Sequence, residues 1–120
     1  KSQVIWIGFG GRGVLLCGDI ELYAQEKIRQ RLPGLKADAV VLPHHGSTAN
    51  LNPAFIAGFE PKIVIASCAA SRKANAYVPP EDSGIEIFHT PLDGAVTVTL
   101  KADGTLCAVG FKSRKTVRLN

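Results

Sequence analysis

The sequence predicts an α/β fold with a mixed sheet and a C-terminal antiparallel hairpin, contained in a single domain over residues 1–120. Strand-like and helix-like segments alternate through the middle of the chain, which is typical of parallel strands joined by crossovers. A glycine-rich turn joins two apolar runs before this region, and an Asp-Gly turn joins two alternating segments after it. These three observations together favour a sheet flanked by hairpins.

A β-hairpin is predicted at the beginning of the chain. Residues 4–9 and 14–17 are apolar, and Gly10-Gly11-Arg12-Gly13 lies between them, where glycines supply the positive φ angles of a tight turn. These glycines do not indicate a phosphate-binding loop, because no Lys followed by Ser or Thr comes next and the following element is a strand.

The clearest helix is predicted over residues 20–32. Apolar side chains recur there every four positions, with Tyr23 on the same face, and Pro33-Gly34 ends the helix. The repeating positions are Ile20, Ala24, Ile28 and Leu32. Asp19 directly precedes this segment, so one interpretation of Asp19 is an N-cap whose carboxylate accepts a backbone N–H.

The remaining elements are shorter. Residues 39–42 form a buried strand that Pro43 ends, and Asn52-Pro53 has the pattern of an N-cap followed by proline at the first position of a short helix. A polar segment over residues 68–83 is broken at Pro79-Pro80. Further strands are expected at residues 62–67, 85–88, 95–100 and 106–111, with Asp103-Gly104 as the last hairpin turn and Val117 in a final edge strand.

The composition, with 46% apolar and 20% charged residues, is that of a soluble globular protein. No apolar run approaches the roughly 20 residues that span a bilayer. The chain begins without Met and directly in a strand-like run, so we expect a piece of a longer protein. Its three cysteines are an odd number without a Cys-x-x-Cys pair, which favours small buried thiols over a disulfide framework.

The net charge of +4 comes from residues 101–120, because the basic and acidic side chains before them balance. The basic residues there are Lys101, Lys112, Arg114, Lys115 and Arg118. Two interpretations stay open: this segment contacts phosphates, or its charges protect a solvated edge strand from pairing with another chain. The second is the more common arrangement.

Two of the three histidines stand together directly after a predicted strand. His44 and His45 follow the apolar run that ends at Pro43, and Asp19 follows an apolar run that ends at Cys17. Imidazoles and carboxylates at strand ends offer lone pairs that a rigid backbone can aim at a divalent metal. The sequence therefore predicts a metal or phosphate site built from Asp19, His44 and His45.

The order of the motifs adds a resemblance. Gly-Asp-Ile at residues 18–20 is followed at characteristic spacing by Pro-His-His-Gly-Ser at residues 43–47, then by Asn75-Ala76-Tyr77 and by residues 89–96. This pattern resembles the metallo-β-lactamase-like domain at the C-terminus of competence DNA-internalisation proteins of the ComEC/Rec2 type. The resemblance implies a four-layer αββα sandwich, of which residues 1–120 would be the C-terminal part only.

The resemblance also implies one or two divalent metals, commonly zinc, and hydrolysis of esters, amides or phosphodiesters. Asp19 matches a metal-binding carboxylate, and one of His44 and His45 matches a late metal-binding histidine, with His45 preferred because Gly46 follows it. The candidate substrate contacts are Ser47, Gly46 and Asn75. No catalytic residue is assigned.

The implied longer protein spans a bacterial cell membrane several times and handles single-stranded or duplex DNA during uptake. This chain would be a domain tethered to that membrane, on a side that the sequence leaves open. Hydrolysis of DNA phosphodiesters by the intact protein is the first hypothesis. The alternatives are a non-catalytic module that binds DNA or a partner, or another hydrolase of the same fold, such as a phosphorylcholine esterase.

The sequence also departs from the family pattern. The His-x-His-x-Asp-His motif that supplies most ligands is absent from residues 1–120, and His89 matches no ligand and is expected to be a surface or packing residue. Val78 stands where relatives often carry His-Pro, and too few residues follow for the usual helix. We therefore expect the chain alone to bind zinc weakly and not to cleave DNA.

Overall fold

The computed structural model describes residues 2–120, and for residues 73 and 74 it describes the backbone alone. Two sheets account for all the named strands. The first consists of β1 (Ile5–Phe9), β2 (Arg12–Leu16), β3 (Ala39–Val41), β4 (Ile63–Ala66) and β5 (Glu86–His89), in that order. The second consists of β6 (Val96–Leu100), β7 (Leu106–Gly110) and β8 (Thr116–Leu119), in that order.

Helices and 3₁₀ segments connect the parallel strands of the first sheet, and the last α-helix leads from β5 to the second sheet. The α-helices are α1 (Leu22–Arg31), α2 (Pro53–Gly58) and α3 (Thr90–Asp93). The 3₁₀ segments are η1 (Pro43–Gly46), η2 (Thr48–Asn50), η3 (Ala70–Asn75) and η4 (Glu81–Ser83). The segment between β4 and β5 thus contains only 3₁₀ turns within the described residues, as the lack of room for a helix predicts.

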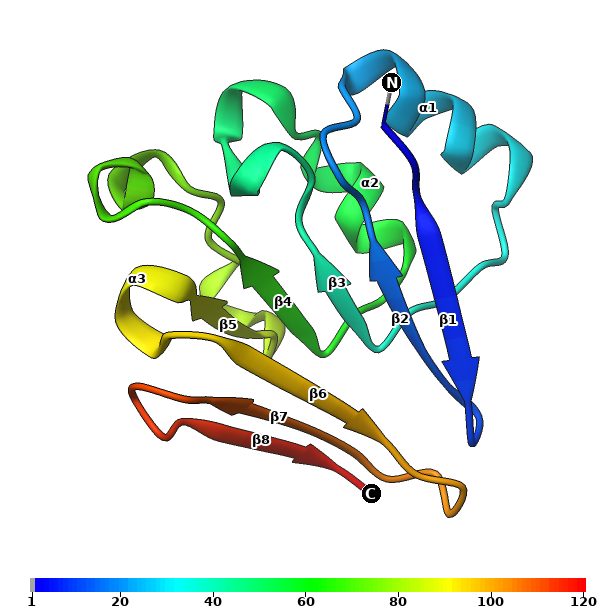
Figure 1. Cartoon of the computed structure of the whole chain (residues 1–120). Helices are drawn as coiled ribbons and strands as arrows, with labels where there is room; N and C mark the ends of the chain where they lie inside the picture. The colour runs from blue at the N-terminus through cyan, green and yellow to red at the C-terminus, as the bar shows by residue number, and fades with distance from the viewer. Residues whose placement is uncertain (1) are drawn as a thin grey trace.

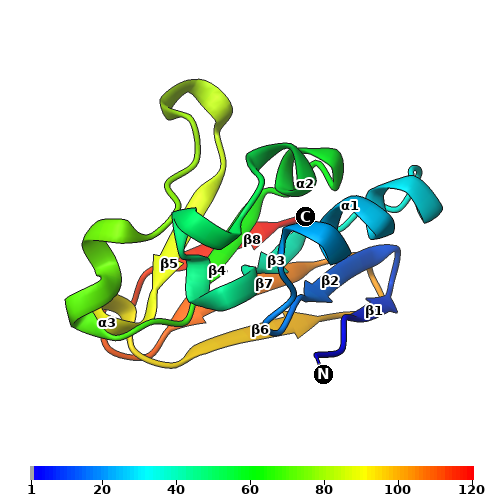
Figure 2. The same cartoon turned by 90° about the horizontal axis from the view of Figure 1, so that it is seen from above.

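The layers follow from the strand order. β1 is antiparallel to β2, whereas β2, β3, β4 and β5 are parallel to one another. Successive parallel strands are neighbours, so right-handed crossovers place their connections on one face of the sheet. Figures 1 and 2 show α1 and α2 on that face and the three-stranded sheet on the opposite face. The predicted α/β fold with a mixed sheet and C-terminal hairpin is confirmed, and the four-layer sandwich stays a prediction.

Two apolar clusters hold the layers together. Phe55 and Ile56 of α2 are fully buried against Leu15, Val40 and Val64 of the first sheet. The second cluster joins the two sheets and contains Val14, Ala39, Ile63, Ile65, Phe88, Leu106 and Ala108. Burial of apolar surface on both faces explains why β3 and β4 are almost continuously apolar in sequence.

The inward face of α1 differs from the prediction. Tyr23 and Leu32 are 76% and 52% exposed, whereas Gln25 is fully buried. Gln25 Nε2 donates to the carbonyl of Asn50 at 2.7 Å, and its Oε1 accepts the N–H of Asn52 at 2.9 Å. The predicted placement of Tyr23 on the buried face is therefore wrong. The centre of that face is occupied by the side-chain amide of Gln25, whose hydrogen bonds connect α1 to the segment before α2.

α1 also begins later than predicted. Its first residue is Leu22, and its N-cap is Glu21, whose side chain makes no capping hydrogen bond. Gly18 has a φ of 59° and turns the chain before the helix, which leaves Asp19 in that turn. The N-cap interpretation of Asp19 is therefore wrong.

Several local predictions are confirmed. Gly10 and Gly11 have φ angles of 61° and 81°, as a two-residue turn between β1 and β2 requires. The side chain of Asn52 accepts the N–H of Ala54 at 3.0 Å and caps α2, with Pro53 as the first helical residue. The helix α3 was not expected, because four residues are too few to show a helical period in sequence.

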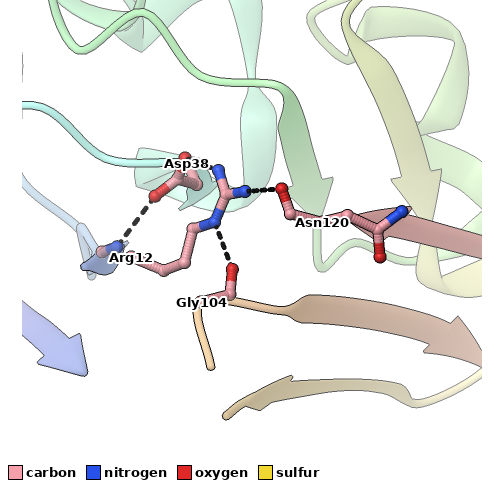
Figure 3. A network of polar contacts seen from close by, with 5 residues as sticks. Arg12, Asp38, Gly104 and Asn120 are labelled. Carbon is pink, nitrogen blue, oxygen red and sulfur yellow. Dashed lines mark hydrogen bonds and ion pairs between the residues drawn. The ribbon is translucent and has the colours of Figure 1, made fainter. Parts of the chain in front are cut away.

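Arg12 ties together segments that are far apart in the chain (Figure 3). Its guanidinium donates to Asp38 at 3.0 Å, to the Gly104 carbonyl at 2.8 Å and to the Asn120 carbonyl at 3.0 Å. The other carboxylate oxygen of Asp38 accepts the N–H of Gly13 at 2.9 Å. Arg12 therefore links the first sheet to two segments at one end of the second sheet, the β6–β7 turn and the end of β8. This link lies at the end of β2 opposite to Asp19.

The basic C-terminal segment lies at a sheet edge. β8 is an outer strand of the three-stranded sheet, where charged side chains hinder pairing with other chains. Lys115 already has partners within the protein, since its Nζ donates to the Ile87 carbonyl at 2.6 Å and lies 4.9 Å from the centre of the Phe88 ring.

In the described part of the chain the three cysteines are free thiols. No helix there has the length and apolar character to cross a membrane.

Candidate functional site

The predicted site residues meet at the carboxyl ends of neighbouring parallel strands. Asp19 follows β2, His44 and His45 follow β3, and Ser67 follows β4. The N–H of His44 donates to the carbonyl of Gly18 at 3.0 Å, which joins the first two of these connections directly. Crevices at the carboxyl ends of parallel strands are the usual position of ligand sites in open α/β sheets.

The turn that carries the two histidines has an uncommon backbone. His44, His45 and Gly46 have φ angles of 49°, 59° and 82°, so three successive residues are left-handed. For residues other than glycine this conformation costs about 1–2 kcal/mol each. It persists only where the surrounding structure enforces it, and such strain is frequent at functional sites.

Neighbouring segments enforce this turn. The N–H of Ser47 donates to the His44 carbonyl at 3.0 Å, and the N–H of Tyr77 donates to the Gly46 carbonyl at 2.6 Å. A Cβ atom at Gly46 would lie 3.1 Å from the Cβ of Ala66, in addition to the positive φ. Gly46 is therefore required by the backbone of the turn, and it does not line the pocket described below.

The ring of His45 is oriented by its own hydrogen bond. Nδ1 lies 2.8 Å from the carbonyl oxygen of Ser67, and a carbonyl only accepts, so Nδ1 carries the proton. In the neutral ring Nε2 then keeps its lone pair, and it lies 3.7 Å from Oδ1 of Asp19. A metal-binding histidine is usually held in this way, with its second nitrogen donating to a carbonyl or carboxylate.

His44 makes a second imidazole–carboxylate pair. Its Nε2 lies 3.7 Å from Oε1 of Glu21, and its side chain is 28% exposed, compared with 62% for His45. Glu21 was not among the predicted site residues. Two such pairs therefore lie side by side, and the pair His45–Asp19 is the more accessible one.

The donors fit a divalent metal in kind and in spacing. With metal–ligand bonds of 2.0–2.2 Å, two ligands of a tetrahedral ion lie about 3.4 Å apart, close to the 3.7 Å between His45 Nε2 and Asp19 Oδ1. They fall short in number, since residues 2–120 contain no group of three or more His, Cys, Asp or Glu side chains that is placed to hold a metal. Burial raises the pKa of the nearby Cys17 thiol to about 12, so in the metal-free chain this thiol is protonated at neutral pH.

A small pocket of about 80 Å³ adjoins the histidines. It is lined by His44, His45, Ser47, Arg72 and Asn75. An isolated antiparallel bridge between Ser47 and Ala76 holds η3 against the histidine turn and so brings Asn75 and Arg72 to the pocket. The structure thus brings Ser47 and Asn75 together with the histidines.

Arg72, Glu21 and Ser67 were missed by sequence reasoning. Arg72 lies in a polar segment without periodicity, and only the long-range Ser47–Ala76 bridge brings it to the site. Ser67 acts through its backbone carbonyl, which any residue at that position supplies. The position of Glu21 two residues after Asp19 was the one available signal.

His89 has a different environment. It is 9% exposed at the end of β5, and its backbone N–H donates to the carboxylate of Asp93 at 2.7 Å. The sequence predicts a surface or packing residue here, and this burial agrees with the packing alternative and not with the surface one.

Comparison with known proteins identifies relatives of this chain, although no protein-family model matches it. The chain is 31% identical over 88 residues to ComE operon protein 3 of Bacillus subtilis (strain 168), which is 73% of this chain and 11% of that protein. It is 31% identical over 113 residues to competence protein ComA of Neisseria gonorrhoeae, which is 87% of this chain and 16% of that protein. The chain is homologous to part of these competence proteins.

A third relative is the uncharacterized protein YcaI of Escherichia coli (strain K12). It is 30% identical over 112 residues, which is 86% of this chain and 14% of that protein. The chain therefore spans between 11% and 16% of the length of these three relatives. The predicted relationship to competence proteins is confirmed, and the metallo-β-lactamase-like character of the domain stays a prediction.

Proposed function

We propose that this chain handles DNA within a longer competence-type uptake protein, and that the connections after β2, β3 and β4 contact the DNA. The observation that carries the proposal is the oriented His45–Asp19 pair at adjacent strand ends in a chain homologous to competence proteins. In this proposal the longer protein spans the bacterial cell membrane, and the present domain is tethered to it.

In the intact protein, the proposed chemistry is metal-dependent hydrolysis of DNA phosphodiesters. His45 Nε2 and Asp19 Oδ1 would hold a divalent ion, with further ligands from other parts of the longer protein. Zinc is the common ion in the metallo-β-lactamase-like domains that the sequence resembles. Such an ion polarises a phosphodiester and lowers the pKa of water. The Ser67 carbonyl keeps the His45 ring in its metal-binding tautomer, and Asp19 offsets the positive charge of the ion.

A second candidate is a non-catalytic module that binds DNA. It is favoured because, within the described residues, fewer than three metal-ligating side chains are placed to share one ion. The two candidates share the contact surface and differ in whether the bound strand is cut.

The decisive experiment uses the longer protein that contains this chain. It is assayed against single-stranded DNA, duplex DNA and small phosphodiesters, with and without added zinc or manganese. Hydrolysis that disappears in Asp19→Asn and His45→Gln variants while DNA binding persists supports the hydrolase. Binding without cleavage under every metal supports the module, cleavage of small phosphodiesters alone supports another hydrolase of this fold, and absence of both activities contradicts the proposal.

A further inference from the structure

We infer that the pocket between the histidine turn and η3 binds the phosphate group of a phosphodiester, and that Arg72 supplies the charge that holds it. The inference rests on the proposed function and deepens it, because it names the chemical group that the site takes. The pocket lies beside the His45–Asp19 pair and shares the His45 side chain with it.

The lining of the pocket is suited to an anion. The residues that line it carry a guanidinium, an amide, a hydroxyl and two imidazoles. The guanidinium, the amide and the hydroxyl can donate hydrogen bonds to an anion. Among the described residues no carboxylate lines it, because Asp19 and Glu21 lie at the Nε2 atoms of the two imidazoles and outside the pocket. A volume of about 80 Å³ accommodates a group of a few heavy atoms, which suits a phosphate better than a nucleobase.

Arg72 is available for a ligand. Among the described residues its guanidinium makes no ion pair and no hydrogen bond. By contrast, Arg12, Arg29 and Arg118 each donate to a side-chain or backbone oxygen of the protein. A guanidinium offers paired N–H groups that match two phosphate oxygens, and charge-assisted bonds of this kind are about twice as strong as neutral ones.

The pocket is held in place by backbone hydrogen bonds. The Ser47–Ala76 bridge and the bond from the Tyr77 N–H to the Gly46 carbonyl fix the end of η3 against the histidine turn. Nδ1 of His45 is engaged by Ser67, which keeps the imidazole in one orientation beside the pocket. A phosphate bound by Arg72 therefore lies next to the two atoms proposed to hold the metal.

The test measures binding of a fluorescent oligothymidylate to this chain by anisotropy over a range of salt concentrations. We expect Arg72→Gln to weaken binding about tenfold and to reduce the slope of log K against log salt by about 0.7, as loss of one phosphate contact requires. Arg31→Gln, which removes the same charge from the exposed end of α1, is the control and should change binding less than twofold. Arg72→Lys should recover only part of the affinity, because an ammonium lacks the paired donors.

Equal effects of Arg72→Gln and Arg31→Gln would overturn the inference and leave DNA binding itself intact. If the wild-type chain alone binds no oligonucleotide, the pocket is judged by NMR titration with dimethyl phosphate and with inorganic phosphate, and the proposed function is judged separately by the assay of the longer protein. Saturable shifts of the Ser47 and Asn75 amide signals that are absent in Arg72→Gln support phosphate binding in the pocket. The ligand with the lower Kd shows whether the pocket prefers a phosphodiester or free phosphate. Shifts that persist in Arg72→Gln, or no shifts, refute it.

Discussion

At the scale of single residues, the chemistry of the site depends on the protonation of one ring. The Ser67 carbonyl fixes the proton of His45 on Nδ1, and this leaves two lone-pair atoms, Nε2 of His45 and Oδ1 of Asp19, facing each other at 3.7 Å. With a neutral ring, these two acceptors do not attract each other, and a cation between them relieves their repulsion. The left-handed turn of His44 and His45 is strained. Such backbone strain is frequent at functional sites, which agrees with a functional role of the His45–Asp19 pair.

Zinc binding by the chain alone tests this arrangement. We expect a Kd weaker than about 1 µM, because complete structural zinc sites reach 10–16 kcal/mol with four ligands. Asp19→Asn and His45→Gln should each weaken binding at least about tenfold, whereas Glu60→Gln, at an exposed carboxylate paired with Lys36, should leave it unchanged. Isothermal titration calorimetry measures all four proteins, and tight stoichiometric binding by the wild type would contradict the prediction.

Cys17 predicts how stability responds to alkaline pH. Burial raises the pKa of its thiol from 9.0 to about 12 in the folded chain, so the unfolded chain loses this proton first. This contribution to stability is therefore fully present well below pH 9 and falls as pH rises towards 12, by about 1.4 kcal/mol at pH 10. Urea unfolding at pH 8 and pH 10 measures this difference, and Cys17→Ala should show a smaller loss over the same interval. An identical loss in the variant would show that other groups cause it.

At the scale of elements, hydrogen bonds to Arg12 connect the two sheets. One guanidinium holds the Asp38 carboxylate and the carbonyls of Gly104 and Asn120, and its side chain is only 23% exposed (Figure 3). Three oxygens at different places in the chain are thereby satisfied by a single planar group. A guanidinium can make these three bonds because its N–H donors are fixed in one plane and point in different directions. The ammonium of a lysine lacks this planar set of donors.

The predicted cost of removing this connection is large for one side chain. Arg12→Met should lower the free energy of unfolding by about 2 kcal/mol, because it leaves Asp38 without its charge partner. Arg12→Lys should restore only part of this. Arg29→Met is the control, since the Arg29–Glu26 pair is roughly half exposed and such pairs contribute less than about 1 kcal/mol. Urea unfolding gives the values, and equal effects of the two methionine variants would argue against a role for the network.

Sequence patterns predicted the strands and turns well, because these depend on local residue order. The hairpin at Gly10-Gly11 and the N-cap at Asn52 need only neighbouring residues, and both are observed. The buried side of α1 was mispredicted because Gln25 is buried by partners from a distant segment, Asn50 and Asn52. The approach of Asp19 to His45 was predictable from parallel strand ends, whereas Arg72 reaches the site through a bridge that no local pattern reveals.

At the scale of the whole molecule, the second sheet covers only part of the first. All five residues of β1 are exposed, and Ile5, Ile7 and Phe9 are each about half accessible. A cleft of about 510 Å³ opens between the sheets beside them. Its lining, apart from Ser67 and Thr90, is apolar: Ile7, Val14, Leu16, Val41, Ile65, Ala95, Val96, Val98 and Leu100. A concave apolar lining of this kind can take up a small apolar molecule.

This open cleft predicts that the chain binds hydrophobic dyes in its folded state. Fluorescence of anilinonaphthalene sulfonate should rise on addition of native chain, and Ile7→Thr combined with Val98→Thr should lower the signal at least about twofold by placing hydroxyls on both walls. Leu92→Thr is the control, because Leu92 is 54% exposed outside the cleft, and it should leave the signal unchanged. Urea unfolding of each variant separates dye binding by the cleft from dye binding by a partly unfolded chain. A native signal that does not respond to the paired change, or that Leu92→Thr lowers equally, would place the dye elsewhere on the surface.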